Sequence, residues 1–145
     1  MSAWFQKPIP RLLFHGTQYK HLESIKKHGL LAGTSERANH PDYAEDVIGY
    51  ISLTDSLITA RRFALYGWGR TSQGERHPDL IVLEIDTFKA AMIGGTKFSP
   101  MRGKLSPDYG GHEYLAIGAI PRGAIIGAYR FRTMDGVNTE EHLRL

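Results

Sequence analysis

Cysteine is absent from this chain of 145 residues. Its absence excludes a disulfide framework, a thiolate metal site and a cysteine nucleophile. Long apolar runs are absent as well, since none approaches the roughly 20 residues that span a bilayer. The segment from Met1 to Pro10 also lacks the apolar core of a signal peptide. We therefore expect a cytoplasmic protein without a membrane partner, although an exported effector without disulfides would have the same composition.

The usual signatures of nucleotide hydrolysis and of metal binding are missing too. The sequence contains no Gly-x-x-x-x-Gly-Lys-[Ser/Thr] loop and no Gly-x-Ser-x-Gly elbow. Its 7 histidines include no pair at the i, i+4 spacing of a helical zinc site. Gly67-Trp68-Gly69 is too short for a dinucleotide fingerprint and follows a predicted helix instead of a strand. The sequence therefore predicts no metal.

A strong charge of either sign is also lacking. The 18 lysines and arginines against 15 acidic residues give a formal net charge of +3, with a pI of about 9.2. This mild excess favours an anionic partner such as a nucleotide or a nucleic acid without identifying one.

The residues that are present indicate one folded domain over 1–145, because 41% of them are hydrophobic. Apolar periodicity predicts strands over Leu12–Phe14, Tyr50–Thr54, Leu80–Ile85, His112–Ile120 and Ile125–Arg132, and helices over residues 18–28 and Ser56–Tyr66. Helices early and strands late favour an α+β domain. We expect a mixed or antiparallel sheet with two early flanking helices.

The boundaries between these elements are less sharply marked. Thr17 is expected to cap the first helix, and Thr54 or Asp55 the second, through side-chain oxygens. The segment Phe88–Ile93 fits either a helical turn or a short strand. Residues 94–111, rich in glycine, are expected to form a loop with short extended pieces. The polar tail after Thr133 is expected to be peripheral.

Three polar points lie within apolar strand sequence, and they are the candidate functional residues. The first is His15-Gly16-Thr17, which is expected to form a polar turn at the end of the first strand, where an imidazole and bare glycine backbone can be presented to a ligand. The second is Ser52 with Thr54. The third is Glu113, a carboxylate in an apolar strand, which costs stability unless it is exposed or paired. Taken singly, each has a plain structural explanation, such as a satisfied histidine in a tight turn or a strand-end charge in solvent.

Together and in this order, the three points resemble the catalytic domain of the ADP-ribosyltransferases. His15-Gly16-Thr17, ahead of a helix that ends in Gly-Leu, is similar to the block that receives the adenosine side of NAD. The run Tyr50–Asp55, with the helix that continues to Phe63, resembles the second block. His112–Leu115 resembles the third, which carries the catalytic glutamate. The resemblance spans Leu12–Phe131 and implies that family's split, mixed or antiparallel sheet.

The resemblance implies an NAD-dependent mono-ADP-ribosyltransferase. Such an enzyme breaks the nicotinamide–ribose bond and transfers ADP-ribose to an acceptor, with NAD as substrate and no metal. The catalytic residues would be Glu113, His15 and Ser52. Glu113 would bind the ribose 2′-hydroxyl and stabilise the positive charge that develops on the ribose. The NAD-binding residues would be His15, Gly16, Thr17, Tyr50, Ser52, Leu53, Thr54, Phe63 and Tyr66.

Two positions depart from the family pattern. Ser52 stands where the histidine style of the family has a tyrosine, so one stacking ring is lost and Tyr50 or Tyr66 would replace it. Gly111 stands where arginine-modifying members have a second acidic residue. Three other readings therefore stay open: an NAD glycohydrolase, an RNA 2′-phosphotransferase of the same fold, and a catalytically degenerate nucleotide-binding or interaction module.

The acceptor and the pyrophosphate ligand are the least defined parts of this hypothesis. Lys97, Arg102 and Lys104 precede Glu113 and favour a nucleic acid acceptor over a basic protein side chain, because they would attract phosphate and repel a cation. The candidates for the pyrophosphate are Arg61, Arg62 and Arg70, and the sequence does not choose among them.

Overall fold

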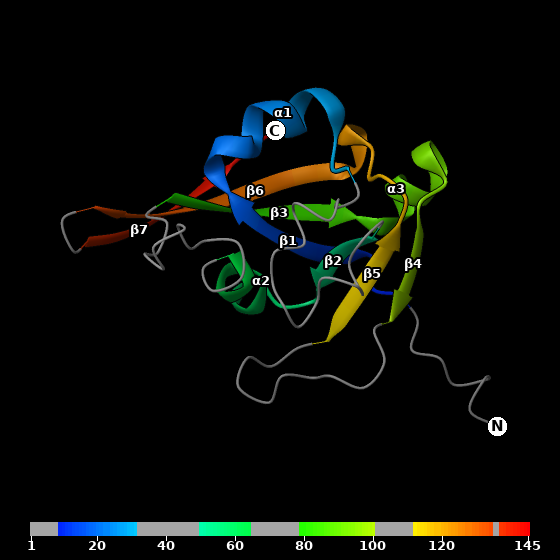
Figure 1. Ribbon diagram of the computed structural model, residues 1–145, viewed down its shortest axis with the longest axis horizontal. Coiled ribbons are helices and arrows are strands. Elements are labelled where there is room, and N and C mark those ends of the chain that lie inside the picture. The colour runs from blue at the N-terminus through cyan, green and yellow to red at the C-terminus, as the bar shows by residue number, and fades with distance from the viewer. Residues whose placement is uncertain (1–8, 32–49, 65–78, 101–111, 135–136) are drawn as a thin grey trace.

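The computed structural model describes residues 9–31, 50–64, 79–100, 112–134 and 137–145. Within these ranges the strands are β1 (Leu12–Gln18), β2 (Tyr50–Thr54), β3 (Asp79–Asp86), β4 (Lys97–Pro100), β5 (Glu113–Ile117), β6 (Ile125–Met134) and β7 (Val137–Leu143). The α-helices in the same ranges are α1 (Leu22–His28), α2 (Leu57–Phe63) and α3 (Thr87–Gly94). The seven strands form one sheet in the order β4-β5-β2-β1-β3-β6-β7, and every pair of neighbours is antiparallel (Figure 1). The domain is therefore α+β.

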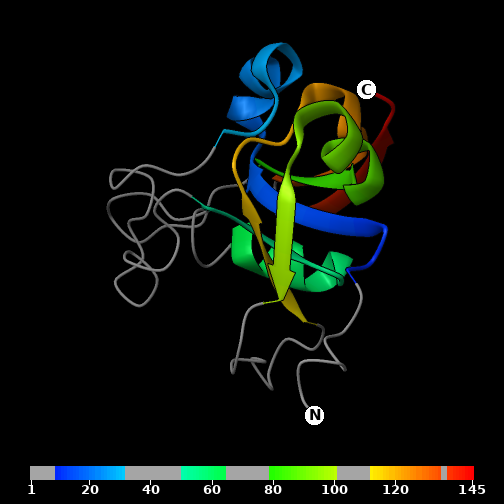
Figure 2. The ribbon, with the colours of Figure 1, turned by 90° about the vertical axis from the view of Figure 1, so that its right-hand side faces the viewer.

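The sheet divides into two blocks that meet at one residue pair. All five residues of β2 pair with β5, and all seven residues of β1 pair with β3. Between β1 and β2, however, the only pair is Phe14 with Thr54. Residues 15–18 of β1 and 50–53 of β2 diverge from there, and we call this unpaired stretch the split. Figure 2 shows the consequence, since β4 and β5 run upright in that view whereas β1 runs across it.

Each face of the sheet has its own apolar core, because side chains alternate along every strand. One core lies under α1 and α3 and includes Leu13, Leu22, Ile25, Leu53, Ile81, Leu83, Ile85 and Ala90. The other lies under α2 and includes Ala60, Ala64, Leu80, Val82 and Phe131. We call these the α1 face and the α2 face. Figure 1 shows α1 and α2 on opposite sides of β1.

The predicted strands are confirmed at their centres, and the sheet is antiparallel rather than mixed. The segment around Phe88–Ile93 forms a third helix, α3, whose N-cap Asp86 accepts a hydrogen bond from the Lys89 backbone at 3.0 Å. Part of the expected glycine-rich loop is β4. The polar tail is peripheral but ordered, since it forms β7 at the edge of the sheet.

Two predicted helix caps are wrong. β1 continues through Gln18, and a 3₁₀ turn at Tyr19–His21 follows it, so that His21 and not Thr17 precedes α1. The N-cap of α2 is Ser56, whose hydroxyl accepts a hydrogen bond from the Thr59 backbone at 3.2 Å. Among the described helices, none is long and apolar enough to cross a membrane.

Candidate functional site

His15 lies in β1 at the start of the split. Its Nδ1 is 2.7 Å from the backbone oxygen of Ser52 in β2. A carbonyl oxygen can only accept, so Nδ1 carries the proton and Nε2 is left as an acceptor in the neutral ring. Burial lowers the pKa of His15, an effect that the hydrogen bond to Ser52 partly opposes. The imidazole is therefore neutral at pH 7 and joins the two blocks where their backbones no longer pair.

Gly16 follows in the same strand, and its lack of a side chain has a packing reason. A Cβ atom at this position would fall inside contact distance of the Ala60 carbonyl group in α2. The strand thus needs glycine here for α2 to lie directly against it. The sequence predicts a turn at His15-Gly16-Thr17; this is wrong, because all three residues are in regular β1 pairing with β3.

β2 presents alternate residues to opposite faces. Tyr50, Ser52 and Thr54 belong to the α2 face, with Tyr50 exposed and Thr54 buried. The Thr54 hydroxyl accepts a hydrogen bond from the Ser56 backbone at 3.2 Å, which ties the end of the strand to the start of α2. Leu53 is fully buried in the core of the α1 face. If Leu53 contacts a ligand, it does so through its backbone.

Glu113 is the first residue of β5 and pairs directly with Thr54. Directly paired residues of an antiparallel sheet project to the same face, so its carboxylate shares the α2 face with Ser52. The side chain is half-buried, and burial raises the pKa of its carboxyl group. Among the described residues it has no hydrogen bond or ion pair. Glu113 is thus a partly desolvated carboxylate whose oxygens accept no hydrogen bond from the described residues.

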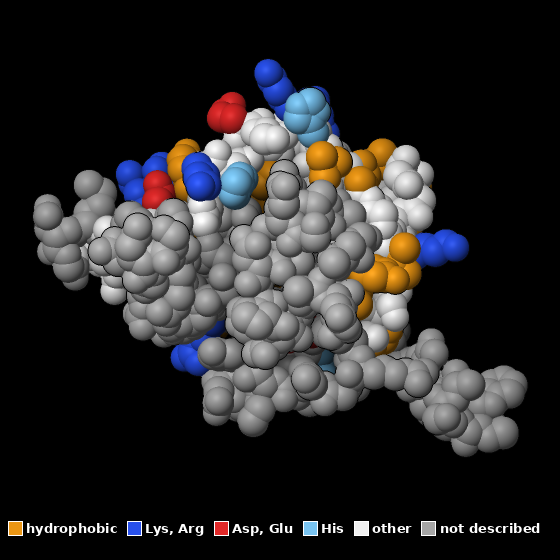
Figure 3. Space-filling view, viewed as in Figure 1, with side chains coloured by type: hydrophobic (Ala, Val, Ile, Leu, Met, Phe, Trp, Pro, Cys, Tyr) orange, Lys and Arg blue, Asp and Glu red, His pale blue; other side chains and the backbone are white. Residues whose placement is uncertain are grey.

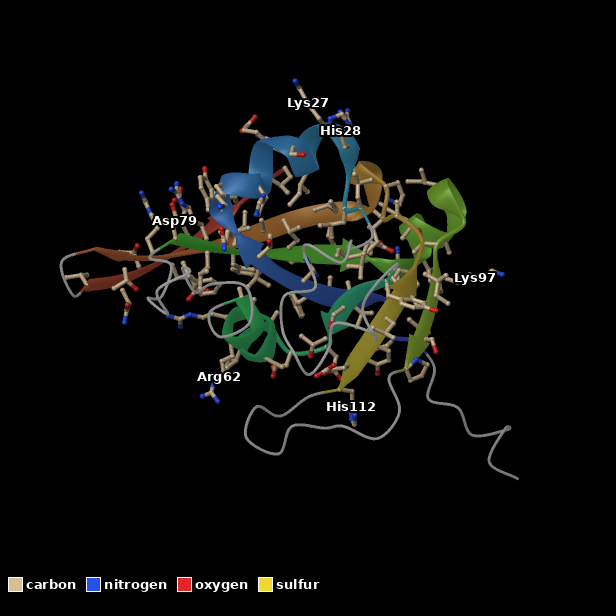
Figure 4. All side chains as sticks on the ribbon, in the orientation of Figure 1. Lys27, His28, Arg62, Asp79, Lys97 and His112 are labelled. Atoms are coloured by element: carbon tan, nitrogen blue, oxygen red, sulfur yellow. The ribbon has the colours of Figure 1, made fainter. Side chains whose placement is uncertain are left out.

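Asp55 and His112 join β2 to β5 just beyond the Thr54–Glu113 pair. The His112 backbone N–H donates to the Asp55 carboxylate at 2.7 Å, and the Asp55 N–H donates to the His112 carbonyl at 3.2 Å. This reciprocal pair locks the start of β5 to the end of β2. Figure 4 labels His112 at that end of β5. The sequence indicates Asp55 only as a helix cap, because its real partner is 57 residues away.

The structure brings the three predicted points together at the closed end of the split. His15 bonds to Ser52, and two residues further along β2 Thr54 pairs with Glu113. His15 and Glu113 do not share a face, however, because alternation from the Phe14–Thr54 pair places His15 on the α1 face. A ligand that contacts both side chains therefore has to lie across the split.

Several predicted residues stay untested. Tyr66, Arg70, Arg102, Lys104 and Gly111 lie outside the described residues, and so does the side chain of Phe63. Arg61 has its guanidinium carbon 4.7 Å from the centre of the Phe131 ring. Arg62 is exposed on α2, where Figure 4 labels it. Neither observation selects an arginine for the pyrophosphate.

The described ranges contain no group of three or more histidine, aspartate or glutamate side chains that could hold a metal ion. The arrangement offers one neutral imidazole acceptor and one carboxylate without a partner among the described residues, both next to the split. No known protein-family model matches the sequence.

Proposed function

We propose that the protein is an NAD-dependent ADP-ribosyltransferase whose site is the split between β1 and β2. The observation that carries the proposal is the placement of His15, Ser52 and Glu113. These residues are distant in sequence and resemble the family's three blocks. His15 donates to the Ser52 carbonyl and Glu113 pairs with Thr54, so both meet β2 within two residues of each other. The split itself agrees with the sheet that the resemblance implies.

Glu113 is suited to the chemical step. When the bond from ribose C1′ to the nicotinamide nitrogen breaks, nicotinamide leaves with the bonding electron pair and positive charge develops on the ribose. The acceptor then bonds to C1′ and gives up a proton to water. An ionised Glu113 that accepts a hydrogen bond from the 2′-hydroxyl stabilises that charge more than it stabilises bound NAD. Partial burial strengthens this interaction, since fewer water dipoles screen it.

His15 is suited to binding and not to proton transfer. Its Nδ1–H is committed to the Ser52 carbonyl, and its lowered pKa keeps Nε2 an acceptor. Nε2 makes no hydrogen bond with the described residues and can accept one from a ribose hydroxyl. Gly16 and Thr17 continue the same strand edge, which β2 leaves unpaired, and can offer backbone groups to the adenosine side.

The experiment is incubation of the purified chain with NAD labelled in the adenylate, following both free nicotinamide and the fate of the label. Glu113→Gln should slow nicotinamide release by about 10²–10³-fold, which corresponds to about 3–4 kcal/mol for one electrostatic group. NAD affinity should stay within a few-fold. Glu140→Gln in the exposed strand β7 is the matched control and should behave like the original chain.

Two outcomes would contradict the proposal. If Glu113→Gln releases nicotinamide at the original rate, Glu113 is a strand-end charge and the assignment fails. If the original chain binds NAD but never releases nicotinamide, the protein is a nucleotide-binding module. Label that ends only as free ADP-ribose would instead identify a glycohydrolase with water as acceptor.

A further inference from the structure

The outer surface of α1 carries a cluster of positive charge, which we call the α1 basic surface. It consists of Lys20, Lys26 and Lys27 with Arg122 from the neighbouring 3₁₀ turn Arg122–Ala124, and all four side chains are exposed. Glu23 is the one acidic side chain on this helix. Four cations and one carboxylate give this small surface a net charge of +3, equal to that of the whole chain.

Ion pairs among the described residues neutralise little of the charge on this surface. The Lys26–Glu23 pair is 3.9 Å long between side chains that are 48% and 88% exposed, so it contributes little. Arg122 donates to the Lys26 carbonyl at 3.4 Å, which places a guanidinium at the end of α1 without neutralising it. Figure 4 labels Lys27 and His28 at the outside of α1, and Figure 3 shows separate lysine or arginine side chains there beside an acidic side chain and a histidine.

The α1 basic surface adjoins the candidate site along the chain and on the same face. Lys20 is three residues after Thr17, in the 3₁₀ turn that continues from β1. α1 packs through Leu22 and Ile25 onto the α1 face, to which His15 and Thr17 also project. A polyanion bound along α1 would therefore lie on the His15 side of the split, and the part of it that accepts ADP-ribose has to reach across the split to Glu113 on the α2 face.

We infer that the α1 basic surface binds the phosphate backbone of a nucleic acid and that nucleic acid is the acceptor of the ADP-ribose. The seven residues of α1 extend for about 10 Å. One nucleic acid strand presents about three phosphates over that length. Lys20 lies before the N-terminal end of α1, and Lys26, Lys27 and Arg122 lie at its C-terminal end. Cations at both ends of the helix match a row of phosphates better than they match a single phosphate group.

A membrane surface fits this helix less well. A helix that lies on a bilayer inserts apolar side chains while its basic residues meet the headgroups. In α1 the apolar residues are Leu22 and Ile25, and both are buried in the protein core. The helix thus presents charge outward with no apolar face of its own to insert.

Binding is measured with fluorescent single-stranded DNA, duplex DNA and RNA of about 20 nucleotides, at several salt concentrations. Three phosphate contacts predict a slope of log K against log salt of about −2.1 for a single strand, or about −2.7 for a duplex. Lys27→Glu should reduce the size of that slope by about one. Lys89→Glu, the same charge change at an exposed position of α3, should leave it unchanged.

The acceptor part of the inference rests on the proposed function and is tested separately. With labelled NAD, the oligonucleotide should gain label, and Lys20→Glu with Lys27→Glu should abolish that labelling. Nicotinamide release measured without oligonucleotide, where water takes up the ADP-ribose, should be unchanged in this double variant. Glu113→Gln should do the reverse, since it keeps oligonucleotide binding and loses NAD turnover. These two variants therefore distinguish failure of the docking surface from failure of the catalytic assignment.

The inference is overturned by any of three results. Equal effects of Lys27→Glu and Lys89→Glu would show that α1 is only a solvated face. Equal binding of anionic vesicles or poly-glutamate at matched charge would show a general polyanion site. Label found on protein alone, with oligonucleotide bound, would remove nucleic acid as the acceptor and leave the NAD chemistry intact.

Discussion

Replacing Glu113 with glutamine should make the protein more stable at neutral pH although it removes the proposed catalytic group. Burial raises the pKa of Glu113, so the folded state favours the protonated carboxyl more than the unfolded chain does. Such a group contributes stability below its unfolded pKa, and that contribution is lost as the pH rises through the folded pKa. At pH 7 the ionised side chain therefore costs folding free energy, and glutamine has no charge to desolvate.

The magnitude follows from the surroundings of the carboxylate. A neutral polar group buried without a partner costs about 1–3 kcal/mol in proteins, and an ionised carboxylate costs more, so the gain from glutamine is the difference between the two. Glu113 is only half-buried, so solvent screening places it near the lower end, at about 1 kcal/mol. For a chain of 145 residues this corresponds to an increase in Tm of about 3 °C.

Thermal unfolding of Glu113→Gln and of the control Glu140→Gln measures this effect at several pH values. The gain of Glu113→Gln should be present at neutral pH and disappear as the pH falls through the raised pKa. The control should show no gain, because Glu140 is exposed on β7. A loss of stability at pH 7 would refute the reasoning, since it would mean that the ionised carboxylate has a stabilising partner.

Three further predictions concern the same region. His15→Ala should weaken NAD binding by about 0.5–1.5 kcal/mol in calorimetry; a single-turnover rate that collapses at saturating NAD would instead make His15 catalytic. Gly16→Ala should lower stability by about 1–3 kcal/mol in denaturant unfolding, because the new Cβ meets the Ala60 carbonyl; an unchanged midpoint would show that α2 shifts freely. The kcat/KM for NAD should fall on acidification through the raised pKa of Glu113, since only the ionised form stabilises the ribose cation; a rate that is flat across this range would separate Glu113 from the chemistry.

The sequence predicts those elements whose burial matches their periodicity. The run Leu80–Ile85 is apolar at nearly every position because both faces of β3 are covered. β7 was not predicted as a strand, because it is an exposed edge strand and its residues are mainly polar. α3 stayed ambiguous because Phe88, Met92 and Ile93 are exposed, so the helix has no continuous buried stripe.

The candidate site could be predicted residue by residue but not as a geometry. His15, Ser52 and Glu113 stand out as polar residues within apolar strands, and that signal is local. Their arrangement depends on which strands are neighbours, and the bond from His15 to the Ser52 carbonyl joins positions 37 residues apart. The packing of α2 on Gly16 is equally non-local. Only the register of the strand pairs reveals that His15 and Glu113 occupy opposite faces.

The two blocks of the sheet are interleaved along the chain. One block contains β1, β3, β6 and β7, and the other contains β2, β4 and β5. The backbone therefore passes from one block to the other four times: after β1, after β2, after β3 and after β5. No single cut of the chain yields a fragment that holds one complete block and nothing of the other. Fragment expression thus cannot isolate either side of the split, and the Phe14–Thr54 junction forms only in a chain that contains both.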